Sequence, residues 1–200
     1  MEMKQIIKHF EDRNINVVEL DTKEQLHAFL TSHIDNNATV ACGGSMTLKE
    51  LEVHDYLKSR EIVYLDREKE GVDMNKIMHD ALSSDVYLSS ANAITEDGEI
   101  FNIDGNGNRV AALIYGPKKV ILVVGENKLV KDLKEARERV KAISAPLNAK
   151  RLHTNTPCVV TGNCADCRSP RRICCSEVVI NYQRDKERMY LVVMKGTYGY

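Results

Sequence analysis

Residues 38–51 read ATVACGGSMTLKEL, and this stretch decides the fold. Its first five residues form a short apolar run that is typical of a buried strand, two glycines follow, and a helical pattern resumes at Thr47. A glycine pair that links a strand to a helix is common in α/β proteins. We therefore expect the rest of the chain to alternate strands with helices.

The sequence on both sides of this stretch repeats the alternation. Compact apolar runs predict strands at 15–20, 62–65, 86–88 and 120–124, and apolar positions at helical spacing predict helices at 3–10, 23–34, 75–82 and 128–143. This order predicts an α/β fold: a single Rossmann-like domain over residues 1–200, with a largely parallel central sheet and helices on both faces.

Two hairpins and a cysteine-rich loop complete the predicted architecture. Residues 93–109 are rich in turn formers, and Asp97-Gly98 is the expected turn of a hairpin there. Residues 177–182 and 189–194 predict a C-terminal hairpin, over about 177–195, packed on the sheet edge. The cysteine-rich loop, about 153–176, precedes it.

The composition excludes several classes of function. The 200 residues are 43% hydrophobic, which is enough for one sizeable core, and 28 Lys and Arg balance 29 Asp and Glu to a formal net charge of −1. This balance provides no field that attracts nucleic acid or anionic membrane. The apolar runs are far shorter than the roughly 20 residues of a membrane span, and residues 1–13 are charged rather than signal-like. We therefore expect a cytoplasmic protein with neither partner.

The glycine turn is a candidate anion site. Backbone N–H groups at the start of a helix can receive a phosphate or carboxylate. The turn lacks the further glycines and the lysine of a Walker loop or a dinucleotide fingerprint, and a purely structural turn explains the same residues. The candidate ligand-binding residues here are Gly43, Gly44, Ser45 and Thr47.

A polar stretch at 92–109 supplies the other candidate ligand-binding residues. Loops over the carboxyl ends of parallel strands are where ligands bind in open α/β sheets. Turn chemistry alone is the competing interpretation, but the stretch has more turn formers than one hairpin needs. The candidates are Asn92, Thr95, Asp104, Gly105, Asn108 and Arg109.

Three segments of this central region resemble the LUD-domain family, whose namesake members are bacterial lactate-utilization proteins. They are SANAITEDGEI at 90–100, GNRVA at 107–111 and YGPKKV at 115–120, and the glycine turn at 43–47 fits the same family. The resemblance extends from about residue 6 to residue 200.

The resemblance implies a fold, a function and partners. The fold is that of the ribose-5-phosphate isomerase and CoA-transferase group, in which the glycine turn holds an anionic small molecule. The function is to support oxidation of L-lactate or a related organic acid together with iron–sulfur oxidoreductase subunits. The sequence leaves open whether the chain forms a homo-oligomer. Related isomerases carry an aspartate where this chain has Asn92, and an amide cannot exchange a proton as a carboxylate does.

An independent isomerase or transferase is the alternative function. It would act on a sugar phosphate or CoA ester, with the glycine turn binding the anion and the carboxylates Glu96, Asp97 and Glu99 as catalytic acid or base. A third interpretation is a metal-stabilised binding module without catalysis.

Five of the six cysteines lie within residues 158–175, and they predict a metal centre. The expected ligands are Cys158, Cys164, Cys167 and Cys174, with Cys175 as the alternative fourth ligand. The spacing favours a [4Fe–4S] cluster, and zinc is the alternative metal. Reduced cysteines at a coincidental spacing are the competing explanation.

Overall fold

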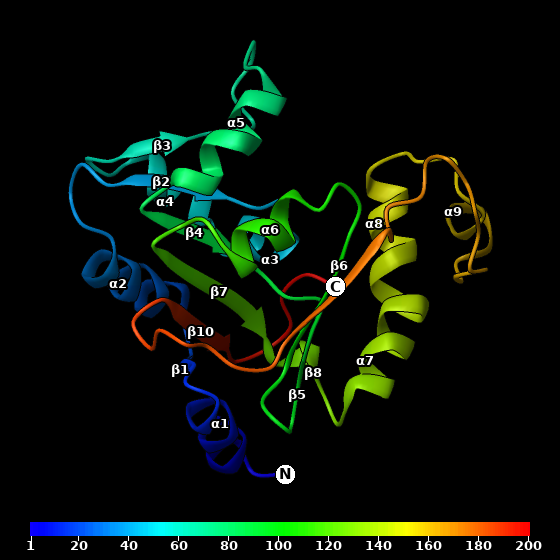
Figure 1. Ribbon diagram of the computed structural model, residues 1–200, viewed down its shortest axis with the longest axis horizontal. Helices are drawn as coiled ribbons and strands as arrows, with labels where there is room; N and C mark the ends of the chain where they lie inside the picture. The colour runs from blue at the N-terminus through cyan, green and yellow to red at the C-terminus, as the bar shows by residue number, and fades with distance from the viewer.

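A six-stranded parallel sheet runs through the middle of the computed structural model, which describes residues 1–200 (Figure 1). Every neighbouring pair in it is parallel. In spatial order its strands are β1 Asn16–Leu20, β10 Met189–Met194, β7 Lys119–Gly125, β4 Val86–Ser89, β2 Thr39–Cys42 and β3 Val63–Leu65.

The central strands serve two hydrophobic cores, one on each face of the sheet. In β7, Val120, Leu122 and Val124 belong to one core, whereas Ile121 and Val123 belong to the other. Successive side chains of a strand point to opposite faces, so a continuous apolar run is what a strand covered on both sides requires.

Helices cover both faces of this sheet. One face is packed by α2 Lys23–His33, α3 Met46–Glu50 and α4 Val53–Lys58. The opposite core takes residues from α1 Met3–Asp12, from α6 Asn108–Ile114 and from the short turn η1 Ala81–Ser83 that follows α5 Met74–Asp80. No helix is both long enough and apolar enough to cross a bilayer.

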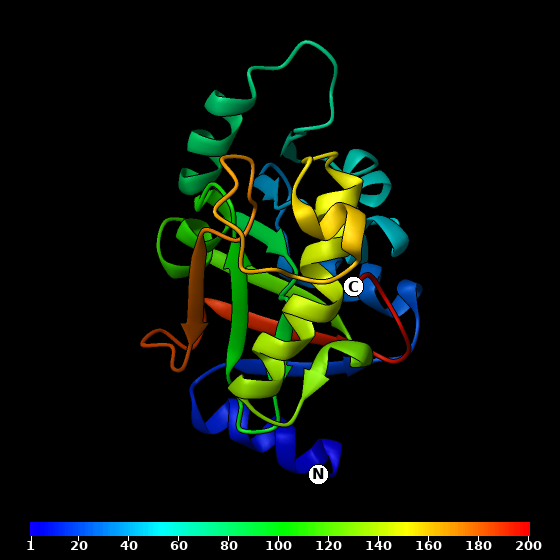
Figure 2. The same cartoon turned by 90° about the vertical axis from the view of Figure 1, so that its right-hand side faces the viewer.

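A smaller second sheet stands beside the first and has its own core. Its strands, in spatial order, are β8 Leu129–Val130, β5 Ala93–Thr95, β6 Ile100–Asp104 and β9 Ser176–Ile180. Phe101 of β6 packs against Ala136 and Val140 of the covering helix. Figure 2 shows this helix in front of the second sheet.

The covering helix is continuous, but a π-helical stretch interrupts its α-helical winding. It consists of α7 Leu133–Arg139, a π-helical stretch at Val140–Ser144 and α8 Ala145–Arg151. Arg139 Nη1 donates to Ser144 Oγ at 2.9 Å across the π-helical stretch and to Asn92 O at 2.8 Å. These bonds fix α8 relative to the segment after β4. The short helix α9 Pro157–Thr161 follows.

The predicted fold class and most predicted elements are confirmed. The chain alternates strands and helices around a parallel sheet, and β5 and β6 form the predicted antiparallel hairpin around Asp97-Gly98. The helix predicted over 128–143 is wrong at its beginning, because η2 Glu126–Lys128 and β8 precede α7.

The predicted C-terminal hairpin is wrong. β9 pairs antiparallel with β6 in the second sheet, whereas β10 lies between β1 and β7 in the main sheet and is parallel to both. Four of the last five residues of β10, LVVM, are buried, as expected of a strand covered on both faces and not of an edge strand.

Gly98 joins the hairpin to α1, and replacing it by alanine is expected to destabilise the protein. Its φ is +86°, and a Cβ there would lie 2.7 Å from the backbone carbon of His9. We expect a loss of roughly 1–2 kcal/mol for the left-handed backbone and about 1–3 kcal/mol more for the steric conflict.

The matched control is Gly71→Ala. Gly71 has a φ of +78° but open space around its Cβ position, so only the backbone contribution applies. Urea denaturation of both variants measures the difference. Equal losses of unfolding free energy in the two variants would show that the close approach of Gly98 to α1 adds nothing to the cost of the substitution.

Candidate functional site

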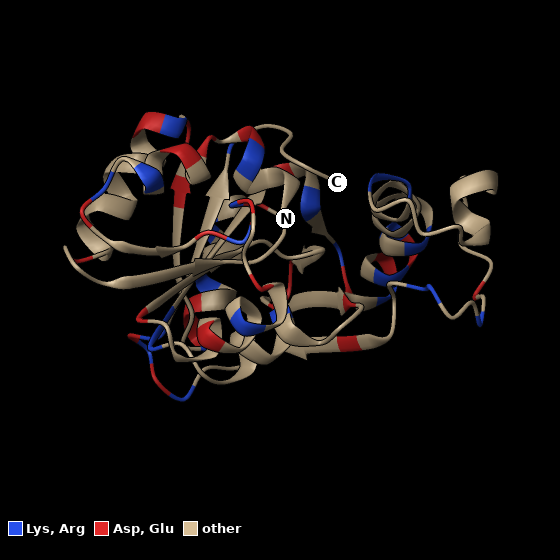
Figure 3. Cartoon of the chain, turned by 90° about the horizontal axis from the view of Figure 1, so that it is seen from above, with Lys and Arg blue, Asp and Glu red and all other residues tan.

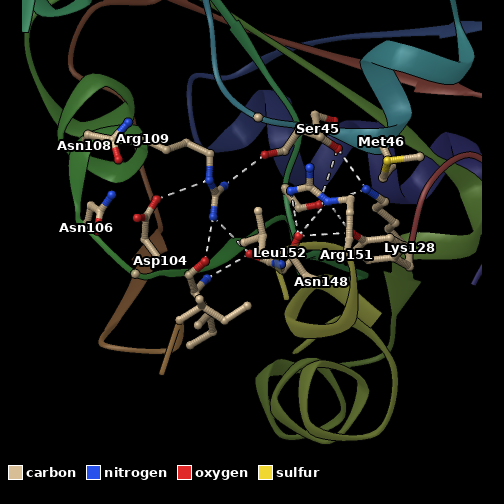
Figure 4. A pocket seen from close by; sticks show the side chains of 18 of the residues that line it. Ser45, Met46, Asp104, Asn106, Asn108, Arg109, Lys128, Asn148, Arg151 and Leu152 are labelled. Carbon is tan, nitrogen blue, oxygen red and sulfur yellow. Dashed lines mark hydrogen bonds and ion pairs between the residues drawn. The ribbon is translucent and has the colours of Figure 1, made fainter. Parts of the chain in front are cut away.

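A cavity of about 220 Å³ lies where the carboxyl ends of β2 and β4 meet the second sheet and α8. Figure 4 places Asp104, Asn106 and Asn108 on one side of this central pocket and Met46, Lys128 and Arg151 on the other. The lining residues are Gly44, Ser45, Met46, Arg67, Ser90, Ala91, Asn92, Ile103, Asp104, Gly105, Asn106, Asn108, Arg109, Lys128, Asn148, Arg151, Leu152, Ile173 and Tyr200.

Arg109 organises one wall of the central pocket. It is largely buried, with 14% of its side chain exposed, and its Nε lies 3.3 Å from Asp104 Oδ2. Burial lowers the pKa of its guanidinium, and the neighbouring Asp104 carboxylate opposes that shift. Its two terminal nitrogens donate four hydrogen bonds, to Ser90 O (3.1 Å), Asn102 Oδ1 (2.6 Å), Asn92 Oδ1 (3.1 Å) and Ile103 O (2.7 Å). Arg109 therefore holds the segment after β4 against β6.

Lys128 is the most unusual side chain of the opposite wall. It is only 3% exposed, and its Nζ contacts Thr47 Oγ1 at 2.8 Å, Ser90 Oγ at 3.0 Å and Ala91 O at 3.3 Å. All three partners are neutral oxygens. Burial, together with the cationic Arg139 and Arg109, lowers the pKa of Lys128 to about 7, and Glu50 partly opposes this shift.

The low pKa of Lys128 predicts a pH-dependent stability. Between about 7 and the ordinary 10.5, the unfolded chain binds a proton that the folded protein does not. Relative to Lys128→Met, the wild type should therefore gain stability as the pH rises through this window, by up to about 1.4 kcal/mol per pH unit. Below pH 7 the buried lysine opposes folding by a constant amount.

Urea denaturation from pH 7 to 10.5 measures this difference. Lys4→Met is the matched control, because Lys4 is exposed. For each variant, the measured quantity is the difference in unfolding free energy from the wild type. If this difference is as independent of pH for Lys128→Met as it is for Lys4→Met, the lowered pKa is contradicted.

Two further arginines leave the central pocket positively charged. Arg67 lies over Gly44, 3.4 Å from the position of an added Cβ there, and has no hydrogen bond or ion pair within the chain. Arg151 donates to the neutral oxygens Asn148 Oδ1 and Tyr200 Oη. Asp104, the one acidic side chain in the lining, is paired with Arg109. The pocket is therefore suited to an anion.

Seven of the ten residues predicted to bind a ligand line the central pocket: Gly44, Ser45, Asn92, Asp104, Gly105, Asn108 and Arg109. The other three do not. Gly43 makes room for Ser89 and Tyr87, because a Cβ there would lie 2.8 Å from Ser89 Oγ and 2.9 Å from Tyr87 Oη. Thr47 supports Lys128, and Thr95 bonds to Glu99.

The three predicted catalytic carboxylates lie outside the central pocket, at the turn end of the β5–β6 hairpin. The backbone oxygen of Glu96 contacts His9 Nδ1 at 2.7 Å, and that of Asp97 accepts from Arg13 Nε at 2.7 Å. Glu99 Oε2 accepts from Thr95 at 3.2 Å. The first two contacts join the hairpin to α1 and its C-cap, and the third lies within the hairpin.

Lys128, Arg67 and Arg151 were missed in the sequence. Arg67 follows β3 and Arg151 ends α8, so neither is near the glycine turn or the polar stretch along the chain. Lys128 fell at the start of the helix predicted over 128–143. The signal that marks it is its position between two apolar segments, β7 and β8.

The cysteine loop does not gather its thiols around one point. All five cysteines are free, and no group of three or more His, Cys, Asp or Glu side chains is placed to hold a metal. Instead Cys164, Cys174 and Cys175 line a second cavity of about 540 Å³ together with Arg172. The arginine donates to the backbone oxygens of Cys167 and Cys174.

Figure 3 shows that Lys and Arg are interspersed with Asp and Glu over the elements of the chain, in keeping with the net charge of −1. The concentration of unpaired positive charge in the central pocket is therefore a local feature and not part of a basic face.

Comparison with known proteins identifies the family. The model of the LUD domain matches residues 3–194. A DUF162 family protein from Deinococcus radiodurans has the same fold: it is 18% identical, the match covers 98% of this chain and 99% of that chain, and the TM-score is 0.52.

Two more distant matches cover about half of the chain. They are eIF2B beta from Chaetomium thermophilum, at 15% identity over 55% of this chain and 39% of that chain with a TM-score of 0.40, and ribose 5-phosphate isomerase from Plasmodium falciparum, at 18% identity over 55% and 52% with a TM-score of 0.35. No curated protein matches the chain.

Proposed function

We propose, from the premise that the chain belongs to the LUD domain family, that it supports oxidation of L-lactate or a related organic acid and binds that acid in the central pocket. The observation that carries this proposal is the pair Arg67 and Arg151, which line a small pocket without a carboxylate partner. An arginine binds a carboxylate through two parallel N–H donors.

The size of the central pocket favours a small acid over a nucleotide-sized ligand. Its volume of about 220 Å³ is below the ~300–1,000 Å³ that is usual for drug-sized ligands. A three-carbon hydroxy acid or oxo acid fits such a space. A CoA ester would have to leave most of its length outside.

The proposal includes iron–sulfur oxidoreductase partners. Oxidation of a hydroxy acid to an oxo acid releases two electrons, and the side chains of the central pocket offer no acceptor for them. In this proposal an iron–sulfur partner protein supplies the acceptor. Affinity purification from the host should recover such a partner, and deletion of the chain should slow growth on lactate; failure of both would contradict the partnership.

A sugar phosphate is the second candidate ligand, because unpaired arginines bind phosphate as well as carboxylate. A thermal-shift comparison separates the classes, with L-lactate, pyruvate, ribose 5-phosphate, acetyl-CoA and inorganic phosphate as the probes. We expect stabilisation by the two organic acids at lower concentration than by inorganic phosphate. Stabilisation by the phosphate ester or by acetyl-CoA alone would favour the isomerase or transferase alternative.

A metal centre in the cysteine loop also remains part of the proposal, supported by the sequence spacing and not by the placement of the thiols. Protein purified without oxygen should then be brown and contain iron and sulfide, and Cys167→Ser should remove both and lower the stability, because binding energy gained on folding appears as stability. Zinc without colour would make the site structural. Metal-free protein whose stability is unchanged by Cys167→Ser would exclude the centre.

A further inference from the structure

We propose that Lys128 binds a 2-oxo acid covalently, as an imine between its Nζ and the C2 carbonyl carbon of the acid. This inference rests on the proposed function, since its ligand is the oxidised form of the acid placed there in the central pocket. It adds a reactive group to a pocket so far described only as a binding site.

The surroundings of Lys128 favour a neutral amine. The side chain is 3% exposed, and its three hydrogen-bond partners are the hydroxyls of Thr47 and Ser90 and the carbonyl of Ala91. A buried ammonium is normally paired with a carboxylate. Here no carboxylate contacts the amine, which is consistent with its pKa of about 7. A neutral amine has the lone pair that attacks a carbonyl carbon.

The same pocket contains groups that can hold the acid for this attack. Arg67 and Arg151 line the cavity with Lys128, and Figure 4 shows Arg151 on the same side as Lys128. An acid whose carboxylate binds these arginines has its C2 carbon one bond from that carboxylate. The carbonyl therefore lies within the small space that the amine also borders.

The reaction balances without an oxidant or reductant. The lone pair of Nζ forms a bond to C2, and the carbonyl oxygen takes up a proton to give a carbinolamine. Loss of that hydroxyl with a second proton releases water and leaves the imine. The hydroxyls of Thr47 and Ser90, within 3.0 Å of Nζ, can carry the proton that the nitrogen loses. A neutral Nζ has only two N–H groups for its three oxygen neighbours. Because the Thr47 hydroxyl donates to the backbone oxygen of Tyr198, the Ser90 hydroxyl is the one that can donate to the lone pair until the acid replaces it.

Borohydride trapping tests the inference directly. The full-length protein is incubated with pyruvate at pH 7, reduced with sodium cyanoborohydride, and analysed by intact mass and peptide mapping. We expect one added mass, equal to pyruvate less one oxygen atom, located on Lys128. At pH 7 about half of a group with a pKa of about 7 is neutral. This neutral fraction is on the order of a thousand times that of a lysine with the ordinary pKa of 10.5.

Two controls keep the result specific. L-lactate has no carbonyl and should give no adduct. Lys128→Met should abolish the adduct, whereas Lys4→Met should retain it. Trapping in the wild type needs no variant, so the test stands even if Lys128→Met folds poorly.

Calorimetric titration with pyruvate separates this inference from the proposed function. Binding that weakens in Arg67→Gln, with no adduct on Lys128 or with adducts spread evenly over exposed lysines, overturns the imine and leaves the binding site in place. Absence of pyruvate and lactate binding overturns the proposed function itself.

Discussion

Replacing Arg109 by alanine is expected to lower the free energy of unfolding by about 3–5 kcal/mol. The guanidinium is largely buried and makes four hydrogen bonds besides its ion pair with Asp104. Its removal leaves the Asp104 carboxylate, only 7% exposed, without its cation. It also separates the segment after β4 from β6, so the central pocket should lose its shape.

Urea denaturation measures the loss, with Arg168→Ala as the matched control because Arg168 is exposed and unpaired. Arg109→Lys should recover only part of the stability, since one ammonium cannot reach all of the acceptors. A loss below about 1 kcal/mol for Arg109→Ala, the size expected of a surface ion pair, would contradict the role assigned to this residue.

The double variant Arg67→Gln with Arg151→Gln is expected to lose at least about a hundredfold in affinity for L-lactate and pyruvate. Hydrogen bonds to a charged group contribute about 1.5–3 kcal/mol each, which corresponds to about tenfold or more per arginine. Stability should change little, because Arg67 makes no internal hydrogen bond and the bonds of Arg151 are exposed.

Titration calorimetry of the wild type, both single variants and Arg168→Gln measures these affinities. We expect each single variant to lose about tenfold and the Arg168→Gln control to bind like the wild type. The assignment of the two arginines as carboxylate ligands fails if the double variant binds both acids as tightly as the control.

The parallel sheet could be predicted because its strands are marked by local composition. Apolar runs such as 120–124 can be buried only between two layers, and the glycines at 43 and 44 mark the turn after β2. The position of β10 could not be predicted in the same way. Its pairing with β1 and β7 joins segments far apart in the chain, and the apolar pattern gives burial but not the identity of a partner strand.

The lining residues of the central pocket that lie close together in the sequence were predicted as candidates, and those that lie far apart in the sequence were missed. The glycine turn and the polar stretch at 92–109 are local signals, and they supplied seven lining residues. Arg67, Lys128 and Arg151 come from three other elements. In the sequence, their basic side chains cannot be distinguished from ordinary surface charges. Only the fold shows that they surround one cavity.

The most direct test of the central claim, that a small organic acid binds in the central pocket, is an amide NMR titration. L-lactate and pyruvate are added to the isotope-labelled protein, and the shifted backbone signals are mapped. We predict that the largest shifts fall on residues lining the pocket, with Gly44, Ser90 and Gly105 among them. Shifts confined to the second cavity, around Cys164 and Cys174, or no saturable shifts with either acid, would contradict the account.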